Sequence, residues 1–219
     1  MMPNSVTELL CTHIGFHAML TNEQLERIKQ HAKVNPCIGI DEFGREFIDK
    51  RLATLEDGEI VVELGTWMGG LVQHFATRYP NLIFHTVDIC NPHVWNAYAT
   101  SISSRLYKFL QECDLVGIDP EDIIHVQQAH LSGIDNIVQH VGSSLDLDIS
   151  NISMLIIDSL HTEEHVTNEL NHFYPKMKKE RFIIGDDYFM PPVRAAFTKF
   201  STQHNLKIKP YGDRVLIST

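Results

Sequence analysis

The sequence predicts an α/β fold: a Rossmann-like, mostly parallel sheet with helices on both faces. Short runs of β-branched and other apolar residues alternate along the chain with longer segments that have helical spacing. Several of these runs end in an acidic residue. In parallel sheets the carboxyl ends of the strands line the ligand crevice. The first run is also followed by a glycine-rich loop and then by a helix. These three observations together favour one doubly wound domain.

Residues 1–57 precede the first clear strand, and we expect them to form a helical N-terminal cap of the same domain that occupies 58–219. Asn22 is suited to cap a helix over residues 23–32. Asp41 then starts a second helix, which runs through Phe43, Phe47, Ile48 and Leu52. The cap is a candidate contact between copies in a homo-oligomer.

Residues 59–70 organise the rest of the chain. Ile60 to Val62 form the first predicted strand, because a continuous β-branched run is typical of a buried parallel strand. Glu63 ends this strand, glycines follow at positions 65, 69 and 70, and a helix is predicted from Leu71 to Tyr79. The glycines let a ligand approach the backbone closely, and the acid offers an oxygen to a cationic or hydroxyl-bearing part of it.

This loop resembles motif I of the class I S-adenosylmethionine (SAM) methyltransferases, which is an acid, any residue, Gly, three residues and Gly. The resemblance implies a seven-stranded sheet whose last strand is antiparallel. It also implies a set of SAM-binding residues: Glu63, Gly65, Thr66, Gly69 and Gly70. The dinucleotide fingerprint G-x-G-x-x-G is absent from the loop. A glycine-rich α/β turn without a ligand is the alternative.

The second predicted strand, Leu82 to Val87, ends in Asp88, roughly 20 residues past the glycine loop. An acid at this place is suited to bind both ribose hydroxyls of SAM, or simply to cap the turn that follows. A helix is then predicted over 93–115, a third strand over 123–126 and a helix over 132–141. Residues 127–130 would lie near the adenine.

Carboxylates follow two further strands. Met154 to Ile157 predict a fourth strand that ends in Asp158, and a helix over 162–176 leads to a fifth strand at 181–185. Asp186 and Asp187 follow that strand directly. Three carboxylates at one rim repel one another, and a hard divalent cation such as Mg²⁺ relieves this repulsion. A helix at 193–200 and two strands, 204–210 and 214–218, complete the prediction.

The segments Ile-Ile-Asp-Ser-Leu-His-Thr and Ile-Ile-Gly-Asp-Asp-Tyr resemble the metal-dependent O-methyltransferases of the macrolide-sugar and cephamycin-biosynthesis group. The resemblance implies that Asp158, Asp186 and Asp187 bind Mg²⁺ and that His161 is the general base. It implies methyl transfer from SAM to a hydroxyl of a sugar, a phenol or another natural product. Leu160 makes the substrate rim more apolar than in many members. A Lys-Glu-Arg segment also replaces the usual glycine-rich turn before the fifth strand.

Three alternatives stay open. His161 to His165 match H-x-x-E-H of the inverted zinc peptidases, in which two histidines share a zinc ion. A nucleotide-binding oxidoreductase would use the same sheet. A non-catalytic relative would bind SAM without turnover.

Composition limits the partners. The formal charge of −10 argues against nucleic acid bound through phosphates, and no apolar run approaches the ~20 residues of a membrane span. The N-terminus lacks the features of a signal peptide, so we expect a cytoplasmic protein. The four cysteines are scattered, which favours reduced thiols. The basic residues at 176, 178, 179 and 181 look like a solvated helix end.

Overall fold

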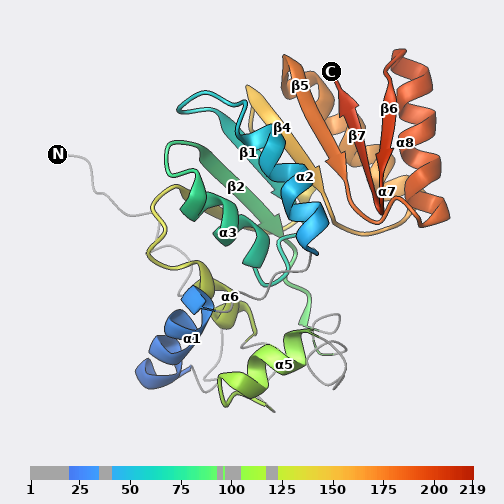
Figure 1. The fold of residues 1–219 in the computed structure, drawn as a ribbon. Helices are drawn as coiled ribbons and strands as arrows, with labels where there is room; N and C mark the ends of the chain where they lie inside the picture. Colours follow the sequence, from blue (N-terminus) through green and yellow to red (C-terminus); the bar gives the residue numbers. More distant parts are fainter. Residues whose placement is uncertain (1–19, 35–40, 93–95, 97–104, 117–122) are drawn as a thin grey trace.

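The computed structural model describes residues 20–34, 41–92, 96, 105–116 and 123–219 (Figure 1). Its centre is a seven-stranded sheet in the order β3-β2-β1-β4-β5-β7-β6. The strands are β1 (Ile60–Leu64), β2 (Ile83–Asp88), β3 (Ile137–Val141), β4 (Ile152–Ile157), β5 (Met177–Gly185), β6 (Ile208–Tyr211) and β7 (Arg214–Ser218). The first five are mutually parallel, whereas β7 is antiparallel to β5 and to β6. The predicted fold class is confirmed.

Helices cover both faces of this sheet. The α-helices are α1 (Asn22–Val34), α2 (Glu42–Leu52), α3 (Gly70–Arg78), α5 (Arg105–Glu112), α6 (Ile123–Leu131), α7 (Glu163–Phe173) and α8 (Pro191–His204). Helices α2 and α3 pack on one face, and α7 and α8 pack on the other (Figure 1). In β1, Val61 joins the first face, whereas Val62 and Leu64 join the second. Successive side chains of a strand point to opposite faces, so one buried strand serves both cores.

A third apolar cluster lies outside the sheet, where α1, α5 and α6 meet. Ile28 of α1 and Leu106 of α5 are fully buried there, as the helical spacing of each segment predicts. Met68 of the glycine loop joins the same cluster. The cluster therefore supports the loop that we expect to hold SAM. Part of the helix predicted over 93–115 lies outside the described residues.

The third strand and its neighbouring helix were predicted in the wrong places. Residues 123–126 belong to helix α6, and strand β3 occupies the end of the segment predicted as a helix over 132–141. Val126 and Ala129 are both buried in the third cluster. Their spacing of three residues puts them on the same side of a helix, so this packing stabilises the helical conformation. The apolar run is equally compatible with a strand until its packing partners are known.

Asn136 fixes the start of β3. Its side-chain amide donates to the backbone oxygens of Ala76, Tyr79 and Leu82 at 3.0–3.1 Å. These oxygens lie at the end of α3 and just before β2. One polar side chain thus sets where the edge strand begins, and hydrophobic periodicity does not reveal it.

The two N-terminal helices differ from prediction in detail. Thr21, not Asn22, caps α1, because its hydroxyl accepts the backbone N–H of Gln24 while its own N–H donates to the Gln24 side chain. Asp41 caps α2 as predicted. Phe43 of α2 is half exposed and stacks on Tyr211. Within the described residues, no helix is long and apolar enough to cross a bilayer.

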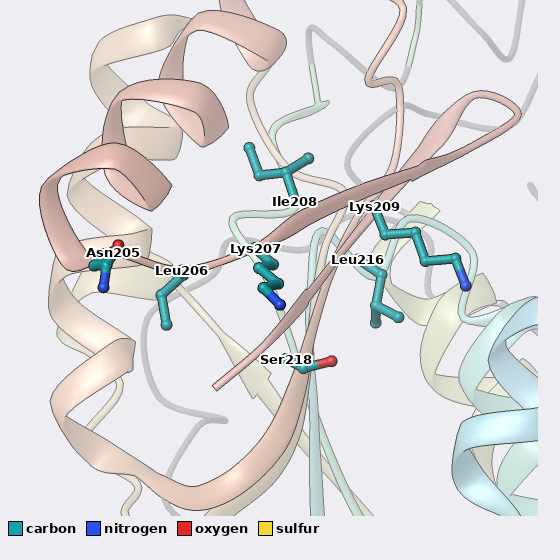
Figure 2. Close-up of a pocket in the computed structure, with 7 residues that line it drawn as sticks. All are labelled: Asn205, Leu206, Lys207, Ile208, Lys209, Leu216 and Ser218. Carbon is teal, nitrogen blue, oxygen red and sulfur yellow. The ribbon is translucent and has the colours of Figure 1, made fainter.

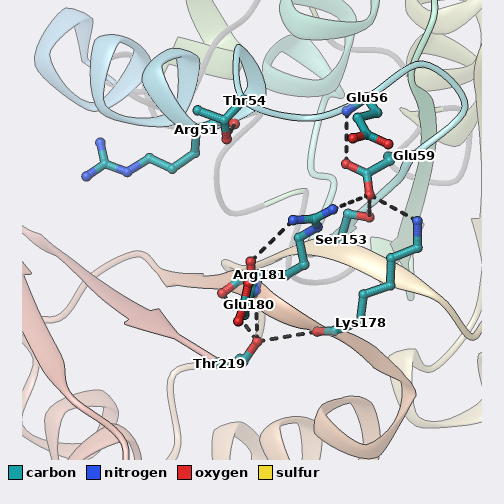
Figure 3. Close-up of polar contacts among 9 residues, drawn as sticks. All are labelled: Arg51, Thr54, Glu56, Glu59, Ser153, Lys178, Glu180, Arg181 and Thr219. Carbon is teal, nitrogen blue, oxygen red and sulfur yellow. Dashed lines mark hydrogen bonds and ion pairs between the residues drawn. The ribbon is translucent and has the colours of Figure 1, made fainter.

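The basic stretch at 176–181 is not a solvated helix end. Strand β5 already begins at Met177, and two of its cations reach the buried carboxylate of Glu59, just before β1 (Figure 3). Lys178 Nζ and Arg181 Nη2 lie 3.0 and 2.8 Å from Glu59 Oε1, and Ser153 donates to the same oxygen at 3.0 Å. This Glu59 cluster joins the amino ends of three neighbouring strands. The departure from a glycine-rich turn therefore has a structural role.

The far edge of the sheet is protected and carries no candidate site. Strand β6 presents Lys209 and Pro210 at this edge, and both residue types discourage pairing with another strand. Figure 2 shows a hollow beside it, lined by residues 205–209 together with Leu216 and Ser218. Ser218 pairs with Phe182 in the register of β5 and β7. The hollow therefore lies away from the strand ends that carry the acidic residues.

Candidate functional site

The glycine loop lies directly against the strand end that carries Asp158. Gly65 has φ of +87°, and a Cβ at this position would lie 2.0 Å from the backbone oxygen of Asp158. A side chain at this position is therefore excluded both by the backbone conformation and by the close approach. Gly69 has φ of +76° and leads into α3, whose first residue is Gly70. The glycine loop and the strand end that carries Asp158, which are separate motifs in the sequence, are therefore in direct contact.

Glu63 is buried behind this loop. The Thr86 hydroxyl donates to its Oε2 at 2.8 Å, and Thr86 also contacts the Thr66 hydroxyl. Burial, followed by the nearby charges of Asp158 and Asp88, raises the pKa of Glu63 to about 8 despite the hydrogen bond from Thr86. Glu63 is therefore neutral at pH 7 and holds the floor of the loop through two threonines. Sequence reasoning missed Thr86, although a polar residue inside an apolar strand was a usable signal.

Asp88 connects the end of β2 to the glycine loop. Its Oδ2 accepts the backbone N–H of Trp67 at 2.7 Å, and its Oδ1 accepts that of Cys90 at 2.7 Å. The turn-capping alternative is thus realised, and each oxygen keeps a further lone pair for a ligand hydroxyl. Burial raises the pKa of Asp88. Gln127, predicted to lie near the adenine, is buried on α6 and donates to the backbone oxygen of Trp67.

Asp158, His161 and Asp187 converge at the neighbouring strand ends. One ligand atom from each lies within 4.8 Å of the other two. The distances from His161 Nε2 are 3.4 Å to Asp158 Oδ1 and 3.3 Å to Asp187 Oδ2. Burial raises the pKa of Asp158, and the pairing with Asp158 raises the pKa of His161. These three residues form the candidate cation site.

Asp186, the third predicted metal ligand, takes a different partner. Arg214 of β7 places its Nε 3.1 Å from Asp186 Oδ1 and its Nη1 3.2 Å from Asp41 Oδ1. Arg214 therefore joins the end of β5 to the N-cap of α2. Its side chain is buried, so both ion pairs are shielded from bulk solvent. Burial and the charge of Asp158 raise the pKa of Asp186 to about 7, against the opposite effect of Arg214. Sequence reasoning missed Arg214, whose signal was a lone cation opening an apolar strand.

A buried carboxylate on α7 supports the site from behind. Glu169 accepts hydrogen bonds from Ser144 at 2.5 Å, from Ser159 at 2.6 Å and from His165 at 3.0 Å. His165 is thereby directed to Glu169, while His161 faces the carboxylates of the candidate cation site. The two histidines of the peptidase-like motif therefore do not converge on one point.

The comparison with protein families identifies the class. A family model described as a methyltransferase domain matches residues 62–188, which is more than half of the chain. The chain belongs to this family, and the protein is a methyltransferase. Membership supports SAM as the cofactor, and it disfavours the oxidoreductase alternative. No curated protein matches the sequence.

Solved structures show the same fold at low identity. The O-methyltransferase NovP has a TM-score of 0.59 and 17% identity, with 88% of this chain and 87% of that chain covered. CalS11, a TDP-rhamnose 3'-O-methyltransferase of calicheamicin biosynthesis, has a TM-score of 0.54 and 12% identity, with coverage of 92% and 97%. TomG from Streptomyces achromogenes, solved with SAM, has a TM-score of 0.52 and 14% identity, with 92% of each chain covered. At these identities the likeness describes the fold.

Proposed function

We propose that this methyltransferase transfers the methyl group of SAM to a hydroxyl of a small molecule with the help of a divalent cation. The observation that carries the proposal is the contact of Gly65 with the Asp158 backbone. It places the loop expected to hold SAM beside the only metal-type cluster among the described residues. A methyl donor and a cation-bound acceptor would therefore meet at one rim of the sheet. Three of the similar structures, NovP, CalS11 and TomG, are named O-methyltransferases, which agrees with an oxygen acceptor.

On the cofactor side, the proposal assigns roles to six residues: Glu63, Gly65, Thr66, Gly69, Gly70 and Asp88. The glycines let SAM approach the backbone, and the remaining lone pairs of Asp88 would accept the ribose hydroxyls. Glu63 supports the loop through Thr86. Because Glu63 is neutral while buried, it would have a hydroxyl to donate as well as an oxygen to accept.

On the acceptor side, the residues present fit a divalent cation. Two carboxylates face a shared nitrogen, and no cationic side chain of the described residues is paired with either Asp158 or Asp187 apart from His161. When bound, the cation lowers the pKa of an acceptor hydroxyl. Arg214 already pairs with Oδ1 of Asp186, so as a ligand Asp186 would have to bind the cation through its other oxygen or lose this ion pair. Asp186 is therefore the weaker member of the predicted set.

The acceptor hydroxyl must also lose its proton. The sequence predicts His161 as the base, which requires Nε2 to face the acceptor. In the structure this nitrogen lies between the two carboxylates. The base role stays a prediction that competes with a role as ligand.

A calorimetric titration tests the proposal. S-adenosylhomocysteine should bind with micromolar affinity with or without cation, and Asp88→Ala should weaken this binding tenfold or more. Glu59→Gln is the control, because its cluster lies at the opposite strand ends. A panel of phenols and sugars with methyl-labelled SAM then identifies the acceptor class. Failure of S-adenosylhomocysteine to bind would overturn the assignment of the loop.

A further inference from the structure

We infer that Glu169 is a positioning residue for SAM, because its carboxylate holds Ser159 and the backbone at Ser159 supports the glycine loop at Gly65. The inference deepens the proposed function and rests on it, since that function assigns the loop to SAM. It concerns the cofactor side of the strand ends and does not depend on a bound cation. Glu169 would not contact SAM itself but would act on SAM binding through Ser159.

Glu169 occupies a position of α7 that faces the apolar core. Val166, Leu170 and Phe173 lie on the same side of this helix and pack in the core between the helix and the sheet. Glu169 has the same helical spacing and is 0% exposed. An acid in such a place costs stability unless it is fully hydrogen-bonded, whereas an apolar side chain of similar size would pack without that cost. The acid is therefore explained by what it binds.

The two oxygens of the Glu169 carboxylate serve different parts of the chain. Oε2 accepts the hydroxyl of Ser159 at 2.6 Å. Oε1 accepts the hydroxyl of Ser144 at 2.5 Å and lies 3.0 Å from Nε2 of His165, whose pKa this contact raises. Among the described residues, no lysine or arginine pairs with Glu169. Hydrogen bonds therefore hold the carboxylate in place, and one whole oxygen is directed to Ser159.

The backbone at Ser159 lies directly against the glycine loop. A Cβ at Gly65 would lie 2.0 Å from the backbone oxygen of Asp158 and 2.9 Å from the Cα of Ser159. On the other side, the amide of Gly65 donates to the backbone oxygen of Val87 at 2.9 Å. Because β1 lies between β2 and β4 in the sheet, the loop that follows β1 is held between the ends of its two neighbours. The peptide that links Asp158 to Ser159 is one wall of that position.

The segment from β4 to α7 carries this wall. Its two ends are fixed, because the amide of Asp158 donates to the backbone oxygen of Leu64 at 2.9 Å and Thr162 caps α7. The bond from Ser159 to Glu169 fastens the part between these ends to the buried face of α7. A binding loop is held precisely only where the layer behind it is fixed as well. Without the Glu169 carboxylate, we expect the wall beside the glycine loop to loosen.

A purely structural role of Glu169 leads to a different expectation. If Glu169 only stabilised α7, its replacement would lower the free energy of unfolding and leave the SAM affinity of the folded protein unchanged. A positioning role lowers that affinity through the single bond to Ser159. Removing either partner should then have the same effect, and removing both should add nothing further.

Calorimetric titration of the full chain with S-adenosylhomocysteine separates these roles. Ser159→Ala and Glu169→Met should each weaken binding, by roughly fivefold to tenfold for the loss of one hydrogen bond to a carboxylate. The double variant should bind no more weakly than Glu169→Met alone. Ser159→Thr keeps the hydroxyl and should retain the wild-type affinity. Ser159→Ala is the smaller change, and it tests the inference even if Glu169→Met does not fold.

His165→Ala is the matched control, because this histidine contacts the same carboxylate at Oε1 and its removal leaves the bond to Ser159 in place. It should keep the affinity for S-adenosylhomocysteine, even where its thermal stability falls. Amide hydrogen exchange over residues 62–69 gives a second readout that needs no ligand. Exchange in this segment should be faster in Ser159→Ala and unchanged in His165→Ala.

Unchanged affinity in Ser159→Ala, or losses that add in the double variant, would overturn the inference and leave the proposed function intact. An equal loss of affinity in His165→Ala would also overturn it, because the effect would then come from a general loosening of α7. If the wild-type protein does not bind S-adenosylhomocysteine, the proposed function itself fails, and the inference fails with it.

Discussion

The two ends of strand β1 carry one buried glutamate each, and the two behave in opposite ways. Glu59 and Glu63 are 3% and 4% exposed. Burial alone would raise both pKa values. At Glu59, hydrogen bonds from the Glu56 backbone, Lys178, Arg181 and Ser153 overcome burial and lower the pKa to about 2. At Glu63, burial and neighbouring acids prevail, and the pKa rises to about 8.

The difference shows which end of the sheet is built for stability. At the amino ends, one carboxylate receives two cations and a hydroxyl, so its charge is compensated within the fold (Figure 3). At the carboxyl ends, acids gather with fewer cations, and several of their pKa values are raised. Keeping these acids ionised costs stability, and a bound cation would stabilise their charged forms. The direction of the pKa shifts therefore distinguishes the carboxyl ends of the sheet from the amino ends.

The largest expected effect separates the two ends by function. Asp158→Ala should abolish cation binding and cation-dependent methyl transfer, with a loss of rate of at least ~10³-fold, because the acceptor loses its positioned charge. Its thermal stability should stay equal to that of the wild type or increase, since one repelling carboxylate is gone. If the wild-type protein turned over equally fast with and without excess chelator, the role of the cation would be contradicted.

Arg214→Met tests the buried arginine at the carboxyl ends. It leaves Asp186 buried and unpaired and frees the N-cap of α2, so the free energy of unfolding should fall by about 3–5 kcal/mol. Urea unfolding measures this change. Asp41→Asn keeps the cap but removes one ion pair, and it should cost clearly less. Equal losses in both variants would show that Arg214 acts through α2 alone.

Glu59→Gln tests the amino ends. Two cations lose their carboxylate while the amide keeps similar volume, so we expect a loss of about 1–3 kcal/mol at pH 7. Binding of S-adenosylhomocysteine to the folded variant should be unchanged. A weakened affinity without a change in stability would mean that this cluster communicates with the site.

The pH dependence of stability should have opposite signs for the two glutamates. Glu59 has a folded pKa of about 2, below its usual 4.5, so its contribution is present above pH 4.5 and is lost as pH falls toward 2. Glu63 has a folded pKa of about 8, above its usual 4.5, so its contribution is lost as pH rises from 4.5 to 8. Compared with the wild type, Glu63→Gln should therefore gain stability over that window. Parallel profiles for Glu63→Gln and Glu59→Gln, measured by thermal unfolding across pH, would remove the contrast.

The sequence by itself determined the strands with continuous apolar runs, the glycine loop and the acidic strand ends. Each of these depends on local chemistry: β-branched residues favour buried strands, and a loop that contacts another backbone requires glycine. Gly65 illustrates this, because its contact with Asp158 leaves no room for a side chain. The methyltransferase family could be predicted from these features.

Only the tertiary structure decided which polar groups meet. The position of β3 depends on Asn136 and on the packing of α6 with α1 and α5, which no periodicity encodes. Lys178 and Arg181 look solvated until Glu59 is placed beside them. Asp186 and Asp187 are adjacent in sequence, yet one faces Arg214 and the other faces His161. Charge pairing depends on distance in space, and residues far apart in the chain supply the partners.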